Sequence, residues 1–390
     1  MISRPRALVA VTALAAGVGL AVPAEATTPT AGYVVTTTPG SPAATLVAAL
    51  GGKIRFRYTS ALHGFSVTLP VPALAALKLL PGVLSVEPNR LLHIDTAQSS
   101  PSWGLDRINQ RSLPLDSRYT YTASGTGVTA YVIDTGITYN HLDFRKAGTT
   151  TSRAVPGFDA ITAGGGAVDC NGHGTHVSGT IGGLTYGVAK NVRLVGVRVL
   201  DCNGSGSTDQ VVAGIDWVTR NHAAGVPAVA NMSLGGSTDT AIDNAVQGAI
   251  ADGITFAVAA GNNGGFLGDL LGSSNACSGS PSRVPAALTV AATDSTDTRA
   301  SYSNIGSCVD LWAPGTDITS DWMGSPTATN TISGTSMATP HVTGVAALYL
   351  TNHRTASPAT VAAVIVNAAT NGVVKSPGSN SPNKLLFEAL

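Results

Sequence analysis

Residues 334–350 read Gly-Thr-Ser-Met-Ala-Thr-Pro-His-Val-Thr-Gly-Val-Ala-Ala-Leu-Tyr-Leu, and the expected fold is organised around this stretch. Apolar side chains lie on nearly every side of the segment after Ser336, which predicts a helix buried in a large core. Pro340 is expected in the first turn of this helix, where a missing N–H costs little. A serine at a helix start is most simply an N-cap worth ~1 kcal/mol, but the unpaired N–H groups there also favour a developing negative charge. The stretch therefore predicts a buried helix that begins with either a capping serine or a nucleophile.

Short apolar strands alternate with helical segments through the larger part of the chain. Strands are expected at 127–133, 193–200, 228–232, 255–259, 287–291 and 310–312. Helices are expected at 173–184, 208–222, 239–252, 336–351 and 358–369. Because this alternation is typical of parallel strands covered by helices on both faces, it predicts an α/β fold with a mostly parallel, doubly wound sheet. Ligands bind such sheets beyond the carboxyl ends of the strands.

A smaller unit precedes this body. Between residues 32 and 95 the expected elements follow the order β-α-β-β-α-β, which predicts a small α+β domain. Residues 96–115 are expected to be loop-like, with 103–106 as an arm laid over the larger body. The chain is therefore predicted to divide into an N-terminal segment at 1–26, the smaller unit at 27–96 and the larger body at 97–390.

The N-terminal segment predicts export. Arg4 and Arg6 precede an apolar run over residues 7–22, and Ala24-Glu25-Ala26 fits the small-x-small cleavage pattern of a secretory signal peptide. The run is rich in Ala and Gly and barely of membrane length, which disfavours a retained anchor. The mature protein is therefore expected to be soluble and secreted.

Charge and cysteine content restrict the function further. Lys and Arg number 22, Asp and Glu also number 22, and only 11% of residues are charged, so no global field would draw the chain to nucleic acid or to an anionic membrane. Four cysteines suit an oxidising compartment and can pair in three ways, of which sequential pairing is one. A zinc site is disfavoured because no Cys-x-x-Cys is present. The cysteines are Cys170, Cys202, Cys277 and Cys308.

Three side chains at element ends form a candidate catalytic set. Asp134 follows an apolar strand, where an Asx turn is the plainer interpretation, and His173 lies between two glycines at a helix start, where a cap or a packed core group is the plainer one. With Ser336 they supply orienter, base and nucleophile from separate elements. Serine is a weak nucleophile at its free pKa, so an imidazole must take its proton and a carboxylate must hold the imidazole in the right tautomer.

Asn262 is a fourth candidate. It follows an apolar strand within Ala260-Gly261-Asn262, and a positioned Asn donor to an oxyanion is worth ~3 to 4 kcal/mol of transition-state stabilisation. Turn formation is the alternative role for Asn262 and the expected role of Asn263.

Four segments carry a resemblance to a known family. Residues 132–136, 172–177, 260–262 and 334–341 resemble the four signatures of subtilisin-like serine proteases, in that family's order of Asp, His and Ser. Residues 201–207, together with the cysteine spacing, are most similar to the aqualysin and proteinase K branch. The resemblance covers about residues 98–390. It implies a secreted endopeptidase of broad specificity that works through an acyl-enzyme.

The same resemblance implies a role for each site residue. Asp134, His173 and Ser336 are the expected triad, and Asn262 forms the oxyanion hole with the N–H of Ser336. Two edge segments are expected to pair with extended substrate by strand addition, and a third segment to form the wall of the S1 pocket. The edge residues are Gly204, Ser205, Gly206, Ser233, Leu234 and Gly235. The S1 wall residues are Ala259, Ala260 and Gly261.

The smaller unit and several oxygen ligands complete the expectations from the resemblance. Residues 27–96 resemble a propeptide that acts as folding chaperone and inhibitor of a self-processing zymogen, with the cut near 95–98. A structural Ca²⁺ is expected on the carbonyls of Pro285 and Ala287 and the carboxylate of Asp310. No catalytic metal is expected, and the mature protein should be a monomer acting on polypeptides. A second calcium site is considered at Asp106, Asn109, Gln110 and Asp116.

Two segments of this sequence depart from the pattern of the aqualysin and proteinase K branch, and other classes of protein could use the same residues. Residues 264–272 are longer and more apolar than the branch usually shows, so the S1 preference is not transferred, and Ser207-Thr208-Asp209 lacks an aromatic found in some relatives. A secreted esterase with the same triad and a binding protein on an inactive protease fold are the competing classes. An α/β-hydrolase is disfavoured by the order of the triad, and a zincin by the spacing of His173 and His176. Packing roles are expected for His176 and His341.

Overall fold

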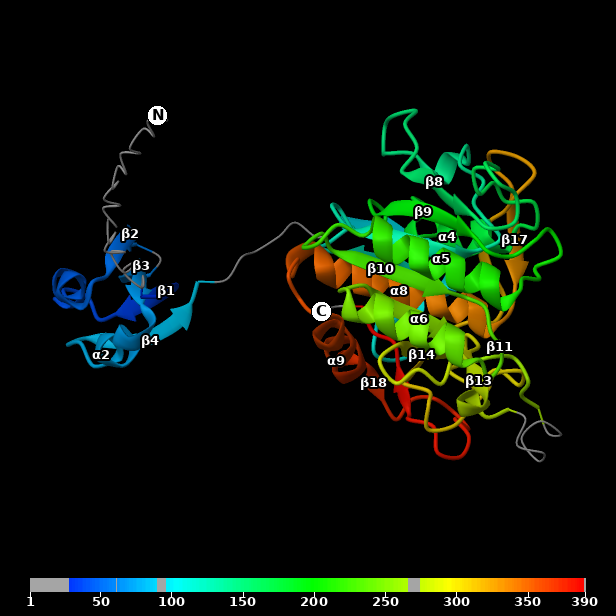
Figure 1. Cartoon of the computed structure of the whole chain (residues 1–390). Coiled ribbons are helices and arrows are strands. Elements are labelled where there is room, and N and C mark those ends of the chain that lie inside the picture. Colours follow the sequence, from blue (N-terminus) through cyan, green and yellow to red (C-terminus); the bar gives the residue numbers. More distant parts are fainter. Residues whose placement is uncertain (1–27, 61, 90–95, 266–273, 389–390) are drawn as a thin grey trace, which may run out of the picture. The chain divides into compact units, whose positions relative to one another are not determined.

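The computed structural model describes residues 28–60, 62–89, 96–265 and 274–388 in two compact units, Met1–His93 and Ile94–Leu390 (Figure 1). The predicted signal segment, most of the 264–272 insertion and Asp95 at the expected cut lie outside the described residues.

The first unit has the predicted β-α-β-β-α-β order. Its four strands form a sheet in the order β2-β3-β1-β4, and helical segments cover one face of it. Its core gathers the apolar side chains of the sheet and helices, including Val35, Phe65 and Leu77. The elements are β1 (Thr30–Thr37), α1 (Ala43–Leu46), η1 (Val47–Leu50), β2 (Lys53–Tyr58), β3 (Gly64–Pro70), η2 (Val71–Ala73), α2 (Leu74–Lys78) and β4 (Val83–Pro88).

The second unit is built on a sheet of nine strands in the order β18-β19-β15-β14-β12-β10-β7-β9-β8. All neighbouring strands pair in parallel except β18 and β19, so the predicted mostly parallel sheet is confirmed. The strands are β7 (Thr129–Asp134), β8 (Ala154–Asp159), β9 (Arg193–Arg198), β10 (Ala228–Met232), β12 (Thr255–Ala259), β14 (Leu288–Thr293), β15 (Leu311–Pro314), β18 (Thr370–Asn371) and β19 (Lys384–Leu385).

Helices cover both faces of this sheet because its strands are apolar on both faces. Along β7, Ala130 and Val132 join one core with α4, α8 and α9, whereas Tyr131 and Ile133 join the other with α5 and α6. The sheet is therefore doubly wound, as predicted. The helices are α4 (His173–Gly182), α5 (Thr208–Asn221), α6 (Thr240–Ala251), α8 (Thr335–Asn352) and α9 (Pro358–Ala368).

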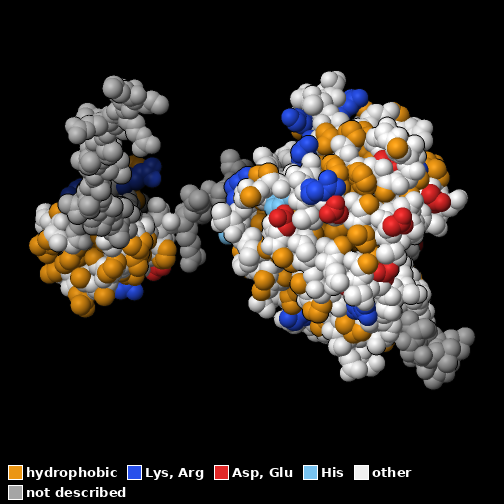
Figure 2. All heavy atoms as spheres, in the orientation of Figure 1, with side chains coloured by type: hydrophobic (Ala, Val, Ile, Leu, Met, Phe, Trp, Pro, Cys, Tyr) orange, Lys and Arg blue, Asp and Glu red, His pale blue; other side chains and the backbone are white. Residues whose placement is uncertain are grey.

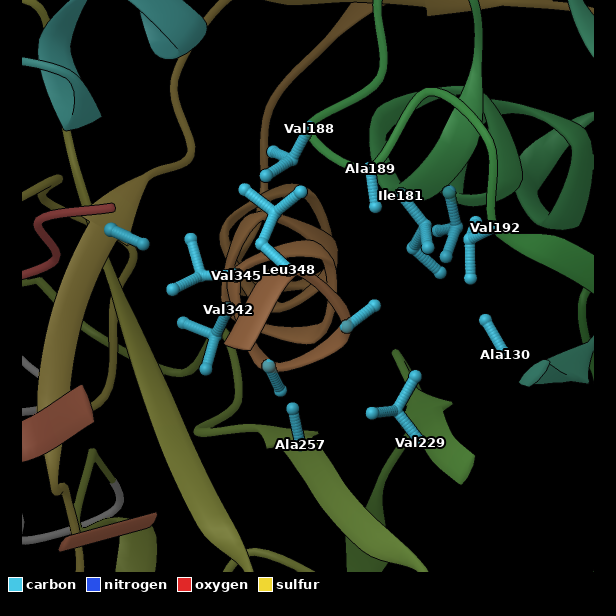
Figure 3. Packing of buried hydrophobic residues seen from close by; sticks show 14 of the residues in the cluster. Ala130, Ile181, Val188, Ala189, Val192, Val229, Ala257, Val342, Val345 and Leu348 are labelled. Carbon is cyan, nitrogen blue, oxygen red and sulfur yellow. The ribbon is translucent and has the colours of Figure 1, made fainter. Parts of the chain in front are cut away.

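Helix α8 is the buried helix that the opening stretch predicts. Figure 3 shows it surrounded by core side chains, with Val342 and Val345 on one side of it and Leu348 directed toward Val188. The prediction for Pro340 was wrong, because the helix begins at Thr335 and the proline lies inside it rather than in the first turn. A proline at that place removes the hydrogen bond that its N–H would give to the carbonyl four residues earlier, which is that of Ser336.

The stretch expected to be a loop before the sheet contains regular structure. Residues 96–115 include strand β5 (Thr96–Ser99), paired with β6 (Arg118–Tyr121), and helix α3 (Trp103–Ile108). The helix is short, and its burial against the body supplies the stability that its sequence alone does not show. Smaller elements are η3 (Leu142–Phe144), η4 (Ala276–Ser278) and the strand pairs β11 (Gly236–Ser237) with β13 (Gly279–Ser280) and β16 (Ile318–Asp321) with β17 (Thr329–Ile332).

Two disulfides close loops of the second unit. Cys170 bonds to Cys202 and Cys277 to Cys308, which is the sequential one of the three possible pairings. Among the described residues, no helix is long and apolar enough to cross a membrane.

Candidate active site

The predicted carboxylate and imidazole meet at the carboxyl edge of the sheet. Asp134 is the last residue of β7 and His173 is the first residue of α4. His173 Nδ1 lies 2.8 Å from Asp134 Oδ1 and 3.0 Å from Oδ2. Because the carboxylate can only accept, Nδ1 carries the proton and Nε2 is the basic nitrogen.

Asp134 acts on the basicity of the ring as well as its orientation. The carboxylate is fully buried, and Thr135 N–H donates to its Oδ1 at 2.7 Å. Burial lowers the pKa of His173, but the charge of Asp134 and the hydrogen bond to it outweigh this effect, so the pKa of His173 is raised. The side chain is 24% exposed, which limits the desolvation effect and supports that direction.

A second carboxylate, missed by sequence reasoning, holds the loop before His173. Asp169 is 7% exposed and accepts hydrogen bonds from Thr135 Oγ1 at 2.9 Å and from the N–H groups of Asn171, Gly172 and Thr175, each at 2.9 Å. These bonds fix the turn that ends in the first residue of α4. Thr175 Oγ1 gives a fifth hydrogen bond to this carboxylate, and the partner that the local sequence cannot show is Thr135, which is 34 residues away.

Ser336 lies in the first turn of α8 beside the segment that follows β10. Its hydroxyl donates to Ser233 O at 3.0 Å, and Ser233 Oγ donates in return to Ser336 O at 2.7 Å. The described hydrogen bonds of the Ser336 hydroxyl do not include His173. Catalytic hydrogen bonds are often long or misaligned without substrate, so this geometry does not remove Ser336 from the set.

The amide of Asn262 is oriented by Thr335. Asn262 Oδ1 accepts from both Thr335 N and Thr335 Oγ1 at 2.9 Å, which directs Nδ2 away from that backbone. Thr335 Oγ1 also accepts from Gly261 N–H at 3.2 Å. Thr335 is a positioning residue that sequence reasoning missed, although it directly precedes the predicted nucleophile.

Two hollows contain the predicted substrate-binding segments. One, of about 450 Å³, is lined by Ala259, Ala260, Gly261, Asn262 and Ser336 among others. The other, of about 620 Å³, is lined by His173 and both predicted edge segments, and Leu234 to Ser237 belong to both hollows. Beside the second hollow, Thr208 Oγ1 donates to Asp239 Oδ2 at 2.6 Å and so joins the starts of α5 and α6.

His176 and His341 have packing roles, as predicted. Both are fully buried, and burial lowers the pKa of each to about 4, so they are neutral near pH 7. His176 Nε2 donates to Ile318 O at 2.9 Å and His341 Nδ1 donates to Met337 O at 2.9 Å.

The residues predicted as calcium ligands have hydrogen bonds within the protein, among them those from Asp116 N–H to Asp106 Oδ1 at 3.3 Å and to Gln110 Oε1 at 3.2 Å. Asp310 Oδ2 accepts from Thr289 N–H at 2.8 Å, which places this carboxylate beside the loop that contains Pro285 and Ala287. In the second set, Asp106 Oδ2 accepts from Ser117 N–H at 2.8 Å, whereas the Asn109 amide donates to Glu388 Oε1 at 2.6 Å. Within the described residues, no group of three or more His, Cys, Asp or Glu side chains could hold a metal ion.

Comparison with known proteins places this geometry in a family. The model of the subtilase family matches residues 125–384, which include all four predicted catalytic residues. This chain belongs to the subtilase family. It is a serine endopeptidase by that membership, and its parallel sheet flanked by helices is the subtilisin-like fold.

Individual subtilases are similar over most of the chain. An extracellular serine proteinase of Thermus sp. (strain Rt41A) is 57% identical over 337 residues, which are 86% of this chain and 78% of that protein. The alkaline serine exoprotease A of Vibrio alginolyticus is 50% identical over 336 residues, 85% of this chain and 59% of that protein. The crystal structure of a cold adapted subtilisin-like serine proteinase superposes with a TM-score of 0.68 at 51% identity, over 75% of this chain and 100% of that one.

Proposed function

We propose that this subtilase is a secreted endopeptidase that cleaves polypeptides through an acyl-enzyme on Ser336. The Asp134–His173 pair at the carboxyl edge of the sheet is the observation that supports this most strongly, because its His173 lines a hollow together with both predicted edge segments. Secretion is supported by the export signal predicted at residues 1–26 and by the similarity to the extracellular serine proteinase of Thermus.

The proposed reaction proceeds in two transfers. His173 Nε2 takes the proton of Ser336 as Oγ attacks the peptide carbonyl carbon, and the C=O electron pair moves onto oxygen. Collapse of this intermediate breaks the C–N bond, and His173 returns the proton to the leaving amine. Water then attacks the ester carbonyl carbon as His173 Nε2 takes its proton, the bond from that carbon to Ser336 Oγ breaks, and His173 returns the proton to Oγ, which releases the acid and restores the free serine. Asp134 stabilises the imidazolium that forms in each transfer.

Asn262 is the proposed side-chain donor to the oxyanion. Its Oδ1 is committed to Thr335, so Nδ2 is the group left for the developing charge. The Ser336 N–H, in the first turn of α8, is the proposed second donor, because the first N–H groups of a helix have no partner within it.

A doubly blocked peptide separates endopeptidase from exopeptidase activity. A peptide acetylated at its N-terminus and amidated at its C-terminus offers no free terminus, so only an endopeptidase acting on internal bonds should cleave it. We expect mass spectrometry to show internal cleavage, and Ser336→Ala to show none. Cleavage only of peptides with a free terminus, or hydrolysis of esters alone, would contradict the proposal.

The first unit is the proposed propeptide and inhibitor. It exposes large apolar side chains, including Phe56 at 54%, Leu79 at 84% and Leu84 at 65%, and Figure 2 shows hydrophobic side chains gathered on this unit. Such exposure favours a role in binding a partner. We expect purified Ser336→Ala to remain an uncleaved precursor. Full maturation of this variant without added protease would exclude self-processing.

A structural Ca²⁺ is proposed on Asp310 with the carbonyls of Pro285 and Ala287. The position of the carboxylate beside this loop and the oxygen-only donor set support the proposal. We expect a chelator to lower the Tm of the wild type by several degrees and to have a smaller effect on Asp310→Asn. An unchanged Tm after chelation of the wild type would contradict it.

A further inference from the structure

A polar side chain lies in the centre of the sheet. Asn231 belongs to β10, whose five residues are all buried, and is itself 0% exposed. A buried amide destabilises a core unless it is hydrogen-bonded. Asn231 Nδ2 donates to Ser233 Oγ at 2.9 Å, and Oδ1 accepts from Thr343 Oγ1 at 2.9 Å. Both ends of the amide are therefore engaged beneath the candidate active site.

Ser233 extends these contacts to the nucleophile. Its Oγ donates to the backbone carbonyl of Ser336 at 2.7 Å. Because a carbonyl can only accept, the Ser233 proton is engaged there, and Ser233 Oγ must accept from Asn231. The nitrogen of the Asn231 amide therefore faces Ser233, its oxygen faces Thr343, and Thr343 must donate. The result is a chain of hydrogen bonds with one direction, from Thr343 through Asn231 and Ser233 to Ser336, which we call the relay.

Pro340 explains why the Ser336 carbonyl is available to the relay. In an α-helix this carbonyl would accept from the N–H of residue 340, but a proline has none. The Ser233 hydroxyl supplies the missing donor from outside the helix. The same two residues also interact in the opposite sense, since Ser336 Oγ donates to Ser233 O at 3.0 Å. The first turn of α8 is thus held at two points to Ser233, the residue that directly follows β10.

We propose that Thr343 and Asn231 are positioning residues for peptide hydrolysis, which rests on the proposed role of Ser336 as nucleophile. They are 1% and 0% exposed, and neither lines the two hollows described above, so they act through Ser233. The relay fixes the Ser336 carbonyl and with it the direction of the hydroxyl and the N–H of that residue. A misplacement of ~1 Å at a reacting group can cost ~10²-fold in rate, so loss of one relay bond is expected to lower kcat.

Substitutions at Thr343 test this role. Thr343→Val keeps the shape of the side chain and removes its donor, whereas Thr343→Ser keeps the donor. Thr351→Val is the control, because Thr351 lies on the same helix, and its Oγ1 donates to Ala347 O at 2.9 Å and accepts from Gly125 N–H at 3.1 Å, both outside the relay. We expect Thr343→Val to lose about tenfold in kcat with KM within twofold of the wild type, measured on a chromogenic peptide against titrated active sites. Thr343→Ser should restore most of kcat, and Thr351→Val should resemble the wild type.

A double-mutant cycle tests whether the effect passes through Ser233. Ser233→Ala should lower kcat, and adding Thr343→Val to it should lower kcat no further, because the last bond of the relay is already lost. The relay would be overturned if kcat were unchanged in Thr343→Val or Ser233→Ala, or if only KM changed. It would also be overturned if Thr351→Val lost as much kcat as Thr343→Val, or if the two losses multiplied in the double variant. If Thr343→Val fails to fold, the kcat of Ser233→Ala still decides. If Ser336 were not the nucleophile, Ser336→Ala would keep its peptidase activity. That result is distinguishable from failure of the relay, in which Ser336→Ala is inactive but Thr343→Val has the kcat of the wild type.

Discussion

At the scale of single residues, the pKa of the His173 imidazole determines how peptidase activity is expected to depend on pH. Its raised value, caused by Asp134 against the opposing effect of burial, means that the neutral base forms only at a higher pH than for a free histidine. Activity should therefore rise with pH, with an apparent pKa above the usual ~6.5. We expect the kcat/KM profile of the wild type to show this shift.

Asp134→Asn is the matching variant. Removing the charge should move the apparent pKa down and lower kcat by ~10⁴-fold, because the amide favours the wrong tautomer of the imidazole. A profile in which this variant keeps the wild-type pKa would show that Asp134 does not control the base.

Asn262 provides a second prediction at this scale. Asn262→Ala removes the proposed side-chain donor to the oxyanion, and we expect kcat to fall by about 10² to 10³-fold with little change in KM. Thr335→Val should have a smaller effect of the same kind, since Thr335 N–H still holds Oδ1. A rise in KM at constant kcat would instead indicate that Asn262 only binds substrate.

At the scale of the element, β16 ends in a buried carboxyl group that lies beside the carboxyl group of Asp143. Asp321 is 0% exposed, no N–H or hydroxyl group among the described residues donates to its oxygens, and its side chain hydrogen-bonds to that of Asp143. His141 Nδ1 lies 3.4 Å from Oδ1 and accepts from Asp143 N–H, while Nε2 donates to Ala328 O. We assign a neutral His141, because burial lowers the pKa of its imidazole. We assign a protonated Asp321, because burial, and after it the charge of Asp143, raises the pKa of its carboxyl group well above the usual range, despite the opposing charge of Arg153.

The sign of the resulting pH effect follows from the raised pKa. Below the usual carboxyl pKa the folded and unfolded states both keep the proton, but at higher pH the unfolded state loses it first, so stability falls until the folded pKa is passed. Asp321→Asn should therefore raise the free energy of unfolding at pH 9 by ~1 to 3 kcal/mol, with little effect near pH 4. Calorimetry of the inhibited enzyme at both pH values would measure this. A variant equally or less stable than the wild type at pH 9 would contradict it.

The sequence predicts the central elements better than the peripheral ones. Strands such as β10 and β12 are recognisable because they are apolar runs buried on both faces. Strand β8 was not predicted because Pro156 and Gly157 interrupt it, which a strand at the edge of a sheet tolerates. Pro340 was wrongly expected in the first turn of α8, which in fact begins at Thr335. The proline is tolerated inside the helix because the Ser233 hydroxyl donates to the Ser336 carbonyl in place of the missing N–H, and no local sequence pattern shows that contact.

In the candidate site, too, some residues could be predicted from local sequence motifs and others could not. Asp134, His173, Asn262 and Ser336 were predicted because each follows a strand or begins a helix within a distinctive local motif. The groups that orient them, Asp169, Thr335 and the relay, depend on contacts between residues far apart in the chain. Ser233 and Ser336, for example, are 103 residues apart in the sequence, so their reciprocal hydrogen bonds require the folded structure.

At the scale of the whole molecule, the two units and the even charge agree with an exported precursor that acts on polypeptides. The face of the second unit shown in Figure 2 carries both basic side chains, most of them toward the upper left of the view, and acidic side chains across its middle. With equal numbers of acidic and basic residues, substrate choice is expected to come from the hollows at the carboxyl edge of the sheet rather than from long-range attraction.

The assignment of Ser336 as nucleophile is the central claim, and covalent labelling tests it most directly. A phosphonofluoridate should phosphonylate the mature enzyme once, with release of fluoride and complete loss of peptidase activity, and peptide mapping should place the adduct on Ser336. Ser336→Ala should take up no label, and Asp134→Asn should be labelled far more slowly. An adduct on another residue, or peptidase activity that survives in Ser336→Ala, would contradict the account.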